Sequence, residues 1–270
     1  MGNLKTTAVV IAAIMAASIP WLSAGGAHAT VISLTTADGL GADTFLNGGD
    51  DVLDATGLPR RDSNFGTLDR LVVKFAPQGS NNNDTNFDSR FTRLSLLRFD
   101  LSSVTGTVTA AKLTLGVKLT EDNANVTFSL NLLPDGNGLD AAPSAGGWDE
   151  TGITMANSLL AGILPLEGLG GRNTVLGGID TMTMFSGNSL RQRVRDDTND
   201  LITFAILPFL NSPQGIQFFS KENLDGVLIP TLELTVDDQN TASVSEPGTL
   251  VLLGLGLMGF AVARRRKLTA

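Results

Sequence analysis

Hydrophobic and polar residues alternate along several stretches of this chain, as they do in a β-strand with one buried face. Between residues 111 and 120, hydrophobic side chains occupy every second position, and Lys or Thr fills most positions between them. The side chains expected to point inward from this stretch and two others are Ala111, Leu113, Leu115, Val117 and Leu119; Val126, Phe128, Leu130 and Leu132; and Leu232, Leu234 and Val236. Further strands are expected at 71–75, 94–101, 201–207 and 215–220. The pattern predicts an all-β protein folded as an antiparallel sandwich.

One short stretch has helical spacing instead. Leu190 and Val194 fall on one face of residues 188–197, and Asn188 or Ser189 is expected to cap this helix. The Gly-rich residues 157–185 follow neither period, and no element is assigned to them.

The first residues have the pattern of a signal peptide. Lys5 precedes an apolar run, Ala8–Ile19, which Pro20 ends. The small residues Ala27 and Ala29 then fit a cleavage site that leaves Thr30 as the first mature residue. The alternative is an uncleaved anchor, but a membrane-spanning helix needs about 20 apolar residues and this run is shorter. We predict a cleaved signal peptide at 1–29.

The chain ends in a second apolar run. Thr249–Ala263 carries no charge, and four cations follow it, Arg264 to Lys267. As a helix this run would extend about 22 Å, and local bilayer thinning with snorkelling of Arg side chains can accommodate the mismatch. We predict a single transmembrane helix with its basic end in the cytoplasm, in preference to a buried C-terminal helix of the body.

This tail resembles the PEP-CTERM sorting signal of Gram-negative bacteria, which joins a Pro-Glu-Pro motif to a short membrane helix and an Arg-rich end. The residues that carry the resemblance are Ser245, Glu246, Pro247, Gly248, Arg264, Arg265 and Arg266, with Ser245 in place of the first Pro. The resemblance implies that an exosortase, a membrane protease-transpeptidase, removes the tail and releases the protein to the cell surface or extracellular matrix.

Composition limits the chemistry of the body. The chain has no Cys, and its one His, His28, lies in the predicted signal peptide. A Ser-His-Asp triad, a Cys nucleophile and a His-ligated metal are therefore excluded from the exported body. Asp149 and Glu150 beside Trp148 look like paired glycosidase carboxylates, but neighbouring strand residues point to opposite faces. We expect Trp148 to fill the core, and we predict that the protein is not an enzyme.

The formal net charge is −8, and the tail holds several of the cations, so the body is still more acidic. Such a body is not expected to bind nucleic acid through its phosphates.

An ordered set of short motifs resembles the DNRLRE-type domain, a jelly-roll module of secreted carbohydrate-binding proteins. The matching pieces are 43–46, 62–67, 71–74, 96–104, 108–115, 148–154, 219–222 and 230–232. Met155 stands where a second Trp is usual, and the insertion after Asn157 has no counterpart. The resemblance implies a jelly-roll β-sandwich that binds polysaccharide without catalysis, and some family members bind acidic polysaccharides such as alginate through a basic face.

Two groups of basic residues are candidates for such a face. Arg60, Arg61, Arg70 and Lys74 are the predicted ligand-binding residues, because Arg and Lys pair with uronate carboxylates. A second group is Arg191, Arg193 and Arg195. For either group the alternative is a set of solvated charges that balance nearby Asp residues.

No metal or other cofactor is predicted, although a structural calcium ion stays open. Calcium takes carboxylate and carbonyl oxygens from loops, and two acidic loops are candidates: Asp50, Asp51 and Asp54, and Asp84, Asn86 and Asp88. Neither has the spacing of an EF-hand, and turn formation explains such residues equally well.

The sequence therefore predicts four parts: a signal peptide at 1–29, a β-sandwich at 30–236, a linker at 237–245 and a sorting tail at 246–270. The expected function is polysaccharide binding at the cell surface or in the extracellular matrix, after an intermediate held in the inner membrane by the tail. The alternative is a structural or adhesion protein of the matrix with protein partners.

Overall fold

A computed structural model describes residues 29–48, 57–75, 92–120, 126–135, 138–158, 167–175, 182–209, 215–224 and 228–237. Ala29–Asp238 forms one compact unit. The predicted signal peptide before Ala29, the linker after Asp237 and the sorting tail lie outside the described residues, as do both candidate calcium loops. Within the described ranges, no helix has the length and hydrophobicity that crossing a membrane requires.

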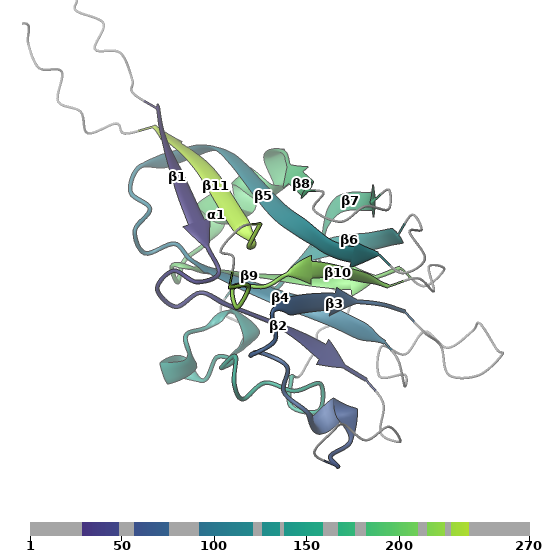
Figure 1. Cartoon of the computed structure of the whole chain (residues 1–270). Coiled ribbons are helices and arrows are strands. Elements are labelled where there is room, and N and C mark those ends of the chain that lie inside the picture. The colour runs from purple at the N-terminus through teal and green to yellow at the C-terminus, as the bar shows by residue number, and fades with distance from the viewer. Residues whose placement is uncertain are drawn as a thin grey trace, which may run out of the picture. The chain divides into compact units, whose positions relative to one another are not determined.

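The body consists of two antiparallel sheets that pack as a sandwich (Figure 1). The first sheet has the order β1 (Ala29–Thr35), β11 (Thr231–Asp237), β5 (Thr107–Thr120), β10 (Ile216–Phe219) and β3 (Arg70–Val73), and β8 (Met182–Ser186) also pairs with β5. The second has the order β2 (Ala42–Asn47), β4 (Arg93–Asp100), β9 (Leu201–Pro208), β6 (Val126–Leu132) and β7 (Glu167–Val175). The helices are α1 (Asn188–Asp196) and the short 3-10 turns η1 (Arg60–Asp62), η3 (Gly138–Asp140) and η4 (Pro143–Ala145). The predicted all-β sandwich is confirmed.

The main core lies between the two sheets and follows the period of two that the sequence shows. Both inward sets predicted for β6 and β11 are buried in it. Phe128 is central, because its ring makes edge contacts with Phe185 at 5.9 Å and with Phe218 at 5.2 Å between ring centroids. These residues come from β6, β8 and β10, so aromatic packing joins the two sheets.

One inward residue was predicted wrongly. Ala111, Leu113, Leu115 and Val117 are buried in the core, but Leu119 is 40% exposed. The cause is a break in register where β5 pairs with β10: Val117 is opposite Phe218 and Leu119 is opposite the adjacent Gln217. The extra residue of this bulge reverses which side chains face the core beyond it.

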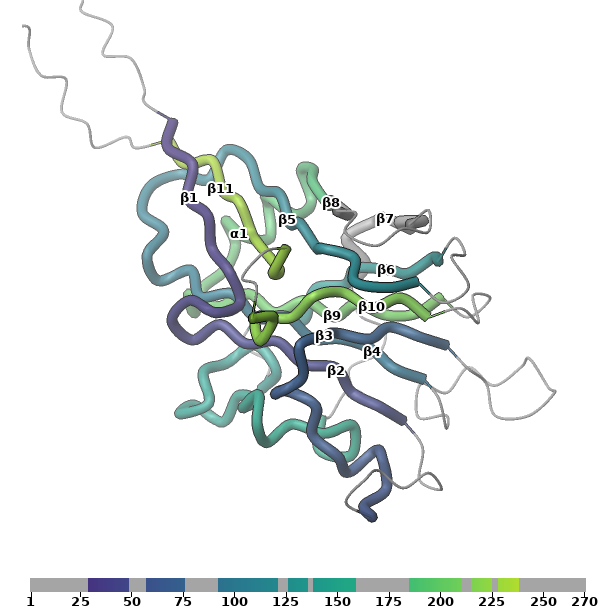
Figure 2. Tube along the Cα trace, viewed as in Figure 1, coloured from purple at the N-terminus to yellow at the C-terminus, as the bar shows by residue number. Residues whose placement is uncertain are grey.

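A second hydrophobic cluster covers the outer face of the second sheet. Leu94 and Leu96 of β4 alternate with the inward residue Leu97 and pack with Trp148 and Ile153. The latter two come from the segment 138–158, which lies beneath β2 and β4 in Figure 2. This outer face of β4 is therefore covered by the chain itself.

The predicted helix is present as α1, with Leu190 and Val194 buried as expected. Its predicted cap is wrong, because the N-cap residue is Gly187 and no side chain caps the helix. Gly187 has φ of 142°, a value that favours glycine at this turn. The unassigned stretch 157–185 contributes β7 and the first part of β8.

Candidate functional site

A hollow of about 290 Å³ opens where the edge strands of the two sheets meet. β3 ends the first sheet, β2 ends the second, and these two strands are in contact (Figure 1). The residues that line this edge hollow are Phe45, Asn47, Arg60, Phe65, Leu68, Arg70, Val72, Arg93 and Gln217. They come from β2, β3, β4, β10 and the segment around η1, so the hollow exists only in the folded sandwich.

Strand alternation brings the arginines to the hollow. Leu71 and Val73 point into the main core, which leaves Arg70 and Val72 on the other face of β3. Arg93 begins β4, and its backbone bonds to Lys74 in both directions, with N···O distances of 2.8 and 3.0 Å. These bonds hold the end of β3 beside the start of β4, and Arg70 and Arg93 line the same hollow.

The hollow also has an aromatic wall and an unpaired acceptor. Phe45 stacks on Phe65 with 4.5 Å between the ring centroids and 17° between the ring planes. Phe45 is buried and Phe65 is half-buried, so part of the Phe65 ring is accessible. Asn47 is 3% exposed, and its Oδ1 atom has no hydrogen-bond partner among the residues that the structure describes. A buried acceptor of this kind normally has a partner, and a bound polar group can supply it.

The local charge of the hollow is opposite to that of the whole chain. Arg60, Arg70 and Arg93 line it, and none of the other lining residues that the structure describes is acidic. The nearest described carboxylate partner of Arg70 is Asp69 at 3.9 Å, but Asp69 lies closer to Lys118, at 2.5 Å. The hydrogen bond from Lys118 lowers the pKa of Asp69 and keeps it ionised. The arrangement can therefore attract an anion.

The structure divides the predicted ligand-binding residues. Arg60 and Arg70 both line the edge hollow, whereas Arg61 and Lys74 are half-buried beside it and do not line it. The second basic group, Arg191, Arg193 and Arg195, lies on α1 and does not contribute to it.

Seven of the nine described lining residues were missed by sequence reasoning, Phe65, Leu68 and Val72 among them. Phe45, Asn47, Arg93 and Gln217 come from strands far apart in the sequence. Arg93 had a usable signal, because it is a cation directly before a hydrophobic strand.

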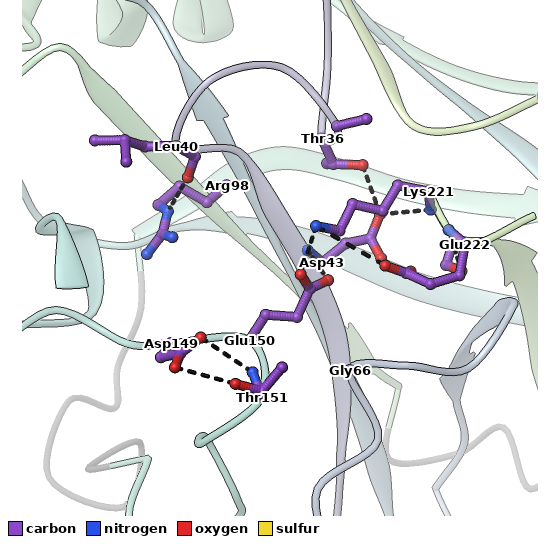
Figure 3. A network of polar contacts seen from close by, with 12 residues as sticks. Thr36, Leu40, Asp43, Gly66, Arg98, Asp149, Glu150, Thr151, Lys221 and Glu222 are labelled. Carbon is purple, nitrogen blue, oxygen red and sulfur yellow. Dashed lines mark hydrogen bonds and ion pairs between the residues drawn. The ribbon is translucent and has the colours of Figure 1, made fainter.

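A separate polar network lies deeper, where Asp43, Glu150 and Glu222 converge on Lys221 (Figure 3). The Lys221 ammonium is 2.5 Å from a Glu150 oxygen and 3.8 Å from a Glu222 oxygen. The Glu150 carboxylate also accepts a hydrogen bond from the backbone N–H of Asp43, at 3.1 Å. Lys221 therefore supplies the counter-charge for this cluster.

Asp43 is the most enclosed member of the network. One carboxyl oxygen accepts bonds from the Thr36 hydroxyl at 2.5 Å and the Lys221 backbone N–H at 2.9 Å, and the other has no partner. Burial, with smaller contributions from Glu222 and Glu150, raises the pKa of Asp43 to about 7. These contacts join β2 to the segment after β10, which is a structural role.

Trp148 is 5% exposed and fills the outer cluster, as the sequence predicted. The Arg98 guanidinium lies over its ring, 4.8 Å from the centroid. Asp149 bonds to Thr151, whereas Glu150 points toward Lys221 (Figure 3). These two carboxylates do not converge, as expected, although they lie in a turn and not in the strand that we assumed.

Comparison with known proteins identifies two stretches of the chain. The PEP-CTERM protein-sorting motif matches residues 243–267, and carbohydrate-binding module family 96 matches residues 54–158. No curated protein matches the chain. Among solved structures, the CBM22-1 xylan-binding domain from Paenibacillus barcinonensis Xyn10C is 9% identical, with 78% of this chain and 97% of that domain covered and a TM-score of 0.32. A likeness this distant supports no argument about ligand.

Residues 54–158 include Arg60, Phe65, Arg70 and Arg93 of the edge hollow, and the two matched stretches agree with the two resemblances seen in the sequence. The C-terminal end of the chain therefore matches the PEP-CTERM sorting motif, and part of its body matches carbohydrate-binding module family 96.

Proposed function

We propose that this exported protein binds an acidic polysaccharide in the edge hollow, without catalysis. The observation that carries the proposal is the convergence of Arg60, Arg70 and Arg93 on one hollow of an otherwise acidic protein. A guanidinium forms two parallel hydrogen bonds with a carboxylate, so these side chains suit the uronate groups of an acidic sugar chain.

The other lining groups suit the neutral parts of a sugar. The accessible part of Phe65 offers an apolar surface for ring C–H groups, and Phe45 holds it in position by stacking. The unpaired Oδ1 of Asn47 can accept a bond from a sugar hydroxyl. The hollow therefore combines charge recognition with one apolar and one polar contact.

The sorting motif supports a proposal for where binding takes place. An exosortase would recognise Glu246, Pro247 and the Arg-rich end while the predicted helix holds the chain in the inner membrane, and would then release it to the cell surface or matrix. The same proposal includes a signal peptide that is cleaved, a tail that forms a membrane helix, and a sandwich with jelly-roll connectivity. A matrix or adhesion protein with protein partners is the alternative.

Binding is tested with the double variant Arg60→Gln and Arg70→Gln. A charge-assisted contact between an arginine and a carboxylate contributes about 1.5–3 kcal/mol to binding. Because the variant loses two such contacts, its affinity for a polyuronate such as alginate should fall by at least about 100-fold. Isothermal titration calorimetry at low and high salt measures this, and wild-type binding should weaken as salt screens the arginines. A neutral glucan should not bind to either protein.

The matched control removes two arginines elsewhere, Arg193→Gln and Arg195→Gln on α1. This variant should bind the polyuronate like the wild type. Equal loss of affinity in both double variants would show that overall charge, and not the hollow, determines binding. No binding of any polyuronate or neutral glucan to folded wild-type protein would favour the adhesion alternative.

A further inference from the structure

A second cluster of carboxylates lies away from the edge hollow and from Lys221. Asp135 follows β6, Asp140 ends η3 and Asp197 follows α1, so three separate segments bring them together. One carboxylate oxygen from each lies within 4.8 Å of the other two. Asp135 is exposed, Asp197 is half-buried and Asp140 is 2% exposed, so the cluster extends from the surface inward.

The buried end of the cluster contains two polar atoms without a well-aligned hydrogen bond. Oδ1 of Asp140 accepts no hydrogen bond from the protein. Beside it, the Thr203 side chain of β9 is fully buried, and its hydroxyl approaches the Asp140 carboxyl group without making a well-aligned hydrogen bond to any described residue. Burying such atoms without good hydrogen bonds is unfavourable, so a bound group that satisfies them is favoured.

The comparison with the Lys221 network shows what this cluster lacks. There, the Lys221 ammonium lies at ion-pair distance from the Glu150 and Glu222 carboxylates, and the backbone N–H of Lys221 donates to Asp43. Here, no described ion pair involves Asp135, Asp140 or Asp197; the one described side-chain partner of Asp135 is the Thr198 hydroxyl, at 2.6 Å. Asp135 is exposed, and Asp197 lines a surface hollow together with Arg195 and Asp200, so the outer end of the cluster is open to solvent.

We propose that Asp135, Asp140 and Asp197 bind a calcium ion that links the end of β6, η3 and the loop after α1. Calcium holds oxygen ligands at about 2.3–2.6 Å, so two ligands on opposite sides of one ion lie about 4.8 Å apart. The three oxygens lie within that distance of one another, and calcium accepts an irregular set of carboxylates and water molecules more readily than magnesium, which demands near-ideal octahedral geometry. The Thr203 hydroxyl would support the Asp140 carboxylate from behind, and water would complete the coordination.

The test uses the full chain, stripped of metal with a chelator and titrated with calcium chloride by calorimetry at pH 7.5. We expect one ion per chain, and about 5–10 °C of thermal stabilisation at a calcium concentration about 100-fold above Kd. Asp135→Asn and Asp197→Asn should each weaken calcium binding by at least 10-fold. Asp196→Asn is the matched control, because it removes a neighbouring exposed charge outside the cluster, and it should bind like the wild type.

Folded wild-type protein that shows neither calcium binding nor thermal stabilisation would overturn the proposal. So would an Asp196→Asn variant that loses as much affinity as Asp135→Asn, because the acidic surface as a whole would then hold the ion. Asp135 is exposed, so Asp135→Asn decides the question even if Asp197→Asn fails to fold. Polyuronate binding by the edge hollow is measured separately, with chelator present.

Discussion

At the scale of single residues, Arg98 makes the most varied set of contacts. It is 2% exposed, and its guanidinium donates to the carbonyls of Leu40 at 2.8 Å, Trp148 at 2.7 Å and Ala141 at 3.4 Å. It therefore ties the turn before β2 and the segment 138–158 to β4. Desolvation lowers the pKa of Arg98, but the carbonyl oxygens and nearby carboxylates keep a buried cation tolerable.

Replacing Arg98 should be costly because it leaves these carbonyls without donors. We expect Arg98→Met to lower the free energy of unfolding by about 3 kcal/mol or more, measured by urea denaturation. Arg98→Lys should recover only part of the lost free energy of unfolding, because an ammonium group cannot reach the same carbonyls at once. Arg195→Met, on the exposed side of α1, should change stability by less than about 0.5 kcal/mol. Equal urea midpoints for Arg98→Met and Arg195→Met would contradict the role of Arg98 in holding these segments together.

At the scale of elements, the segment 138–158 depends on Asn64 as well. The Asn64 amide donates to the carbonyls of Glu150 at 2.6 Å and Ile153 at 2.7 Å, and its oxygen accepts from the N–H of Gly66 at 3.1 Å. One side chain thus fixes the turn after η1 to the segment that carries Trp148.

Asn64→Asp keeps the acceptor for Gly66 but removes both donors. We expect the free energy of unfolding to fall by about 2 kcal/mol. Amide hydrogen exchange should accelerate in residues 148–153 more than in β5, because the segment opens locally first. Asn157→Asp removes one exposed donor from the same segment and should have a much smaller effect. Uniform acceleration in both regions of Asn64→Asp would show that the loss is global.

The same scale shows how far the sequence could be interpreted. Strands with clean alternation, such as β6 and β11, were predicted with their buried faces, because one face contacts the core and the other does not. Leu119 was misplaced because a bulge depends on the partner strand, which local pattern does not reveal. The N-cap of the helix was predicted wrongly for a similar reason, because Gly187 forms the turn that leads into α1.

The candidate sites were predictable only where the sequence already groups the residues. Arg60 and Arg70 were found because they lie close together in the chain, whereas Phe45 and Gln217 join them only through the meeting of two sheet edges. The cluster of Asp135, Asp140 and Asp197 was not anticipated, because Asp197 reaches the other two only through the fold.

At the scale of the whole molecule, buried carboxyls make stability depend on pH. The pKa of Asp43, Asp140 and Asp197 is about 7 in the folded protein, above the ordinary value of 3.8. Between these values the folded state binds more protons than the unfolded state, so the free energy of unfolding falls as pH rises. The lowered pKa values of Asp69 and Asp100 act oppositely, but only below about pH 4.

In the presence of a chelator, the melting temperature should therefore be lower at pH 8 than at pH 5. Asp43→Asn should flatten this dependence, because the neutral amide does not titrate and can still accept the bonds from Thr36 and Lys221. Differential scanning calorimetry across this range measures both effects. A melting temperature that rises from pH 5 to pH 8 would contradict the assignment of buried, protonated carboxyls.

The pairing of β1 with β11 has a consequence for export. Ala29 is directly opposite Asp237, so both ends of the body leave from one corner of the first sheet. β5 and β10 separate that corner from β3, which borders the hollow. A cut, an anchor or a fusion at either terminus is therefore distant from Arg60, Arg70 and Arg93. A protein attached by one of its ends would keep the opposite edge of the sandwich accessible to sugar chains.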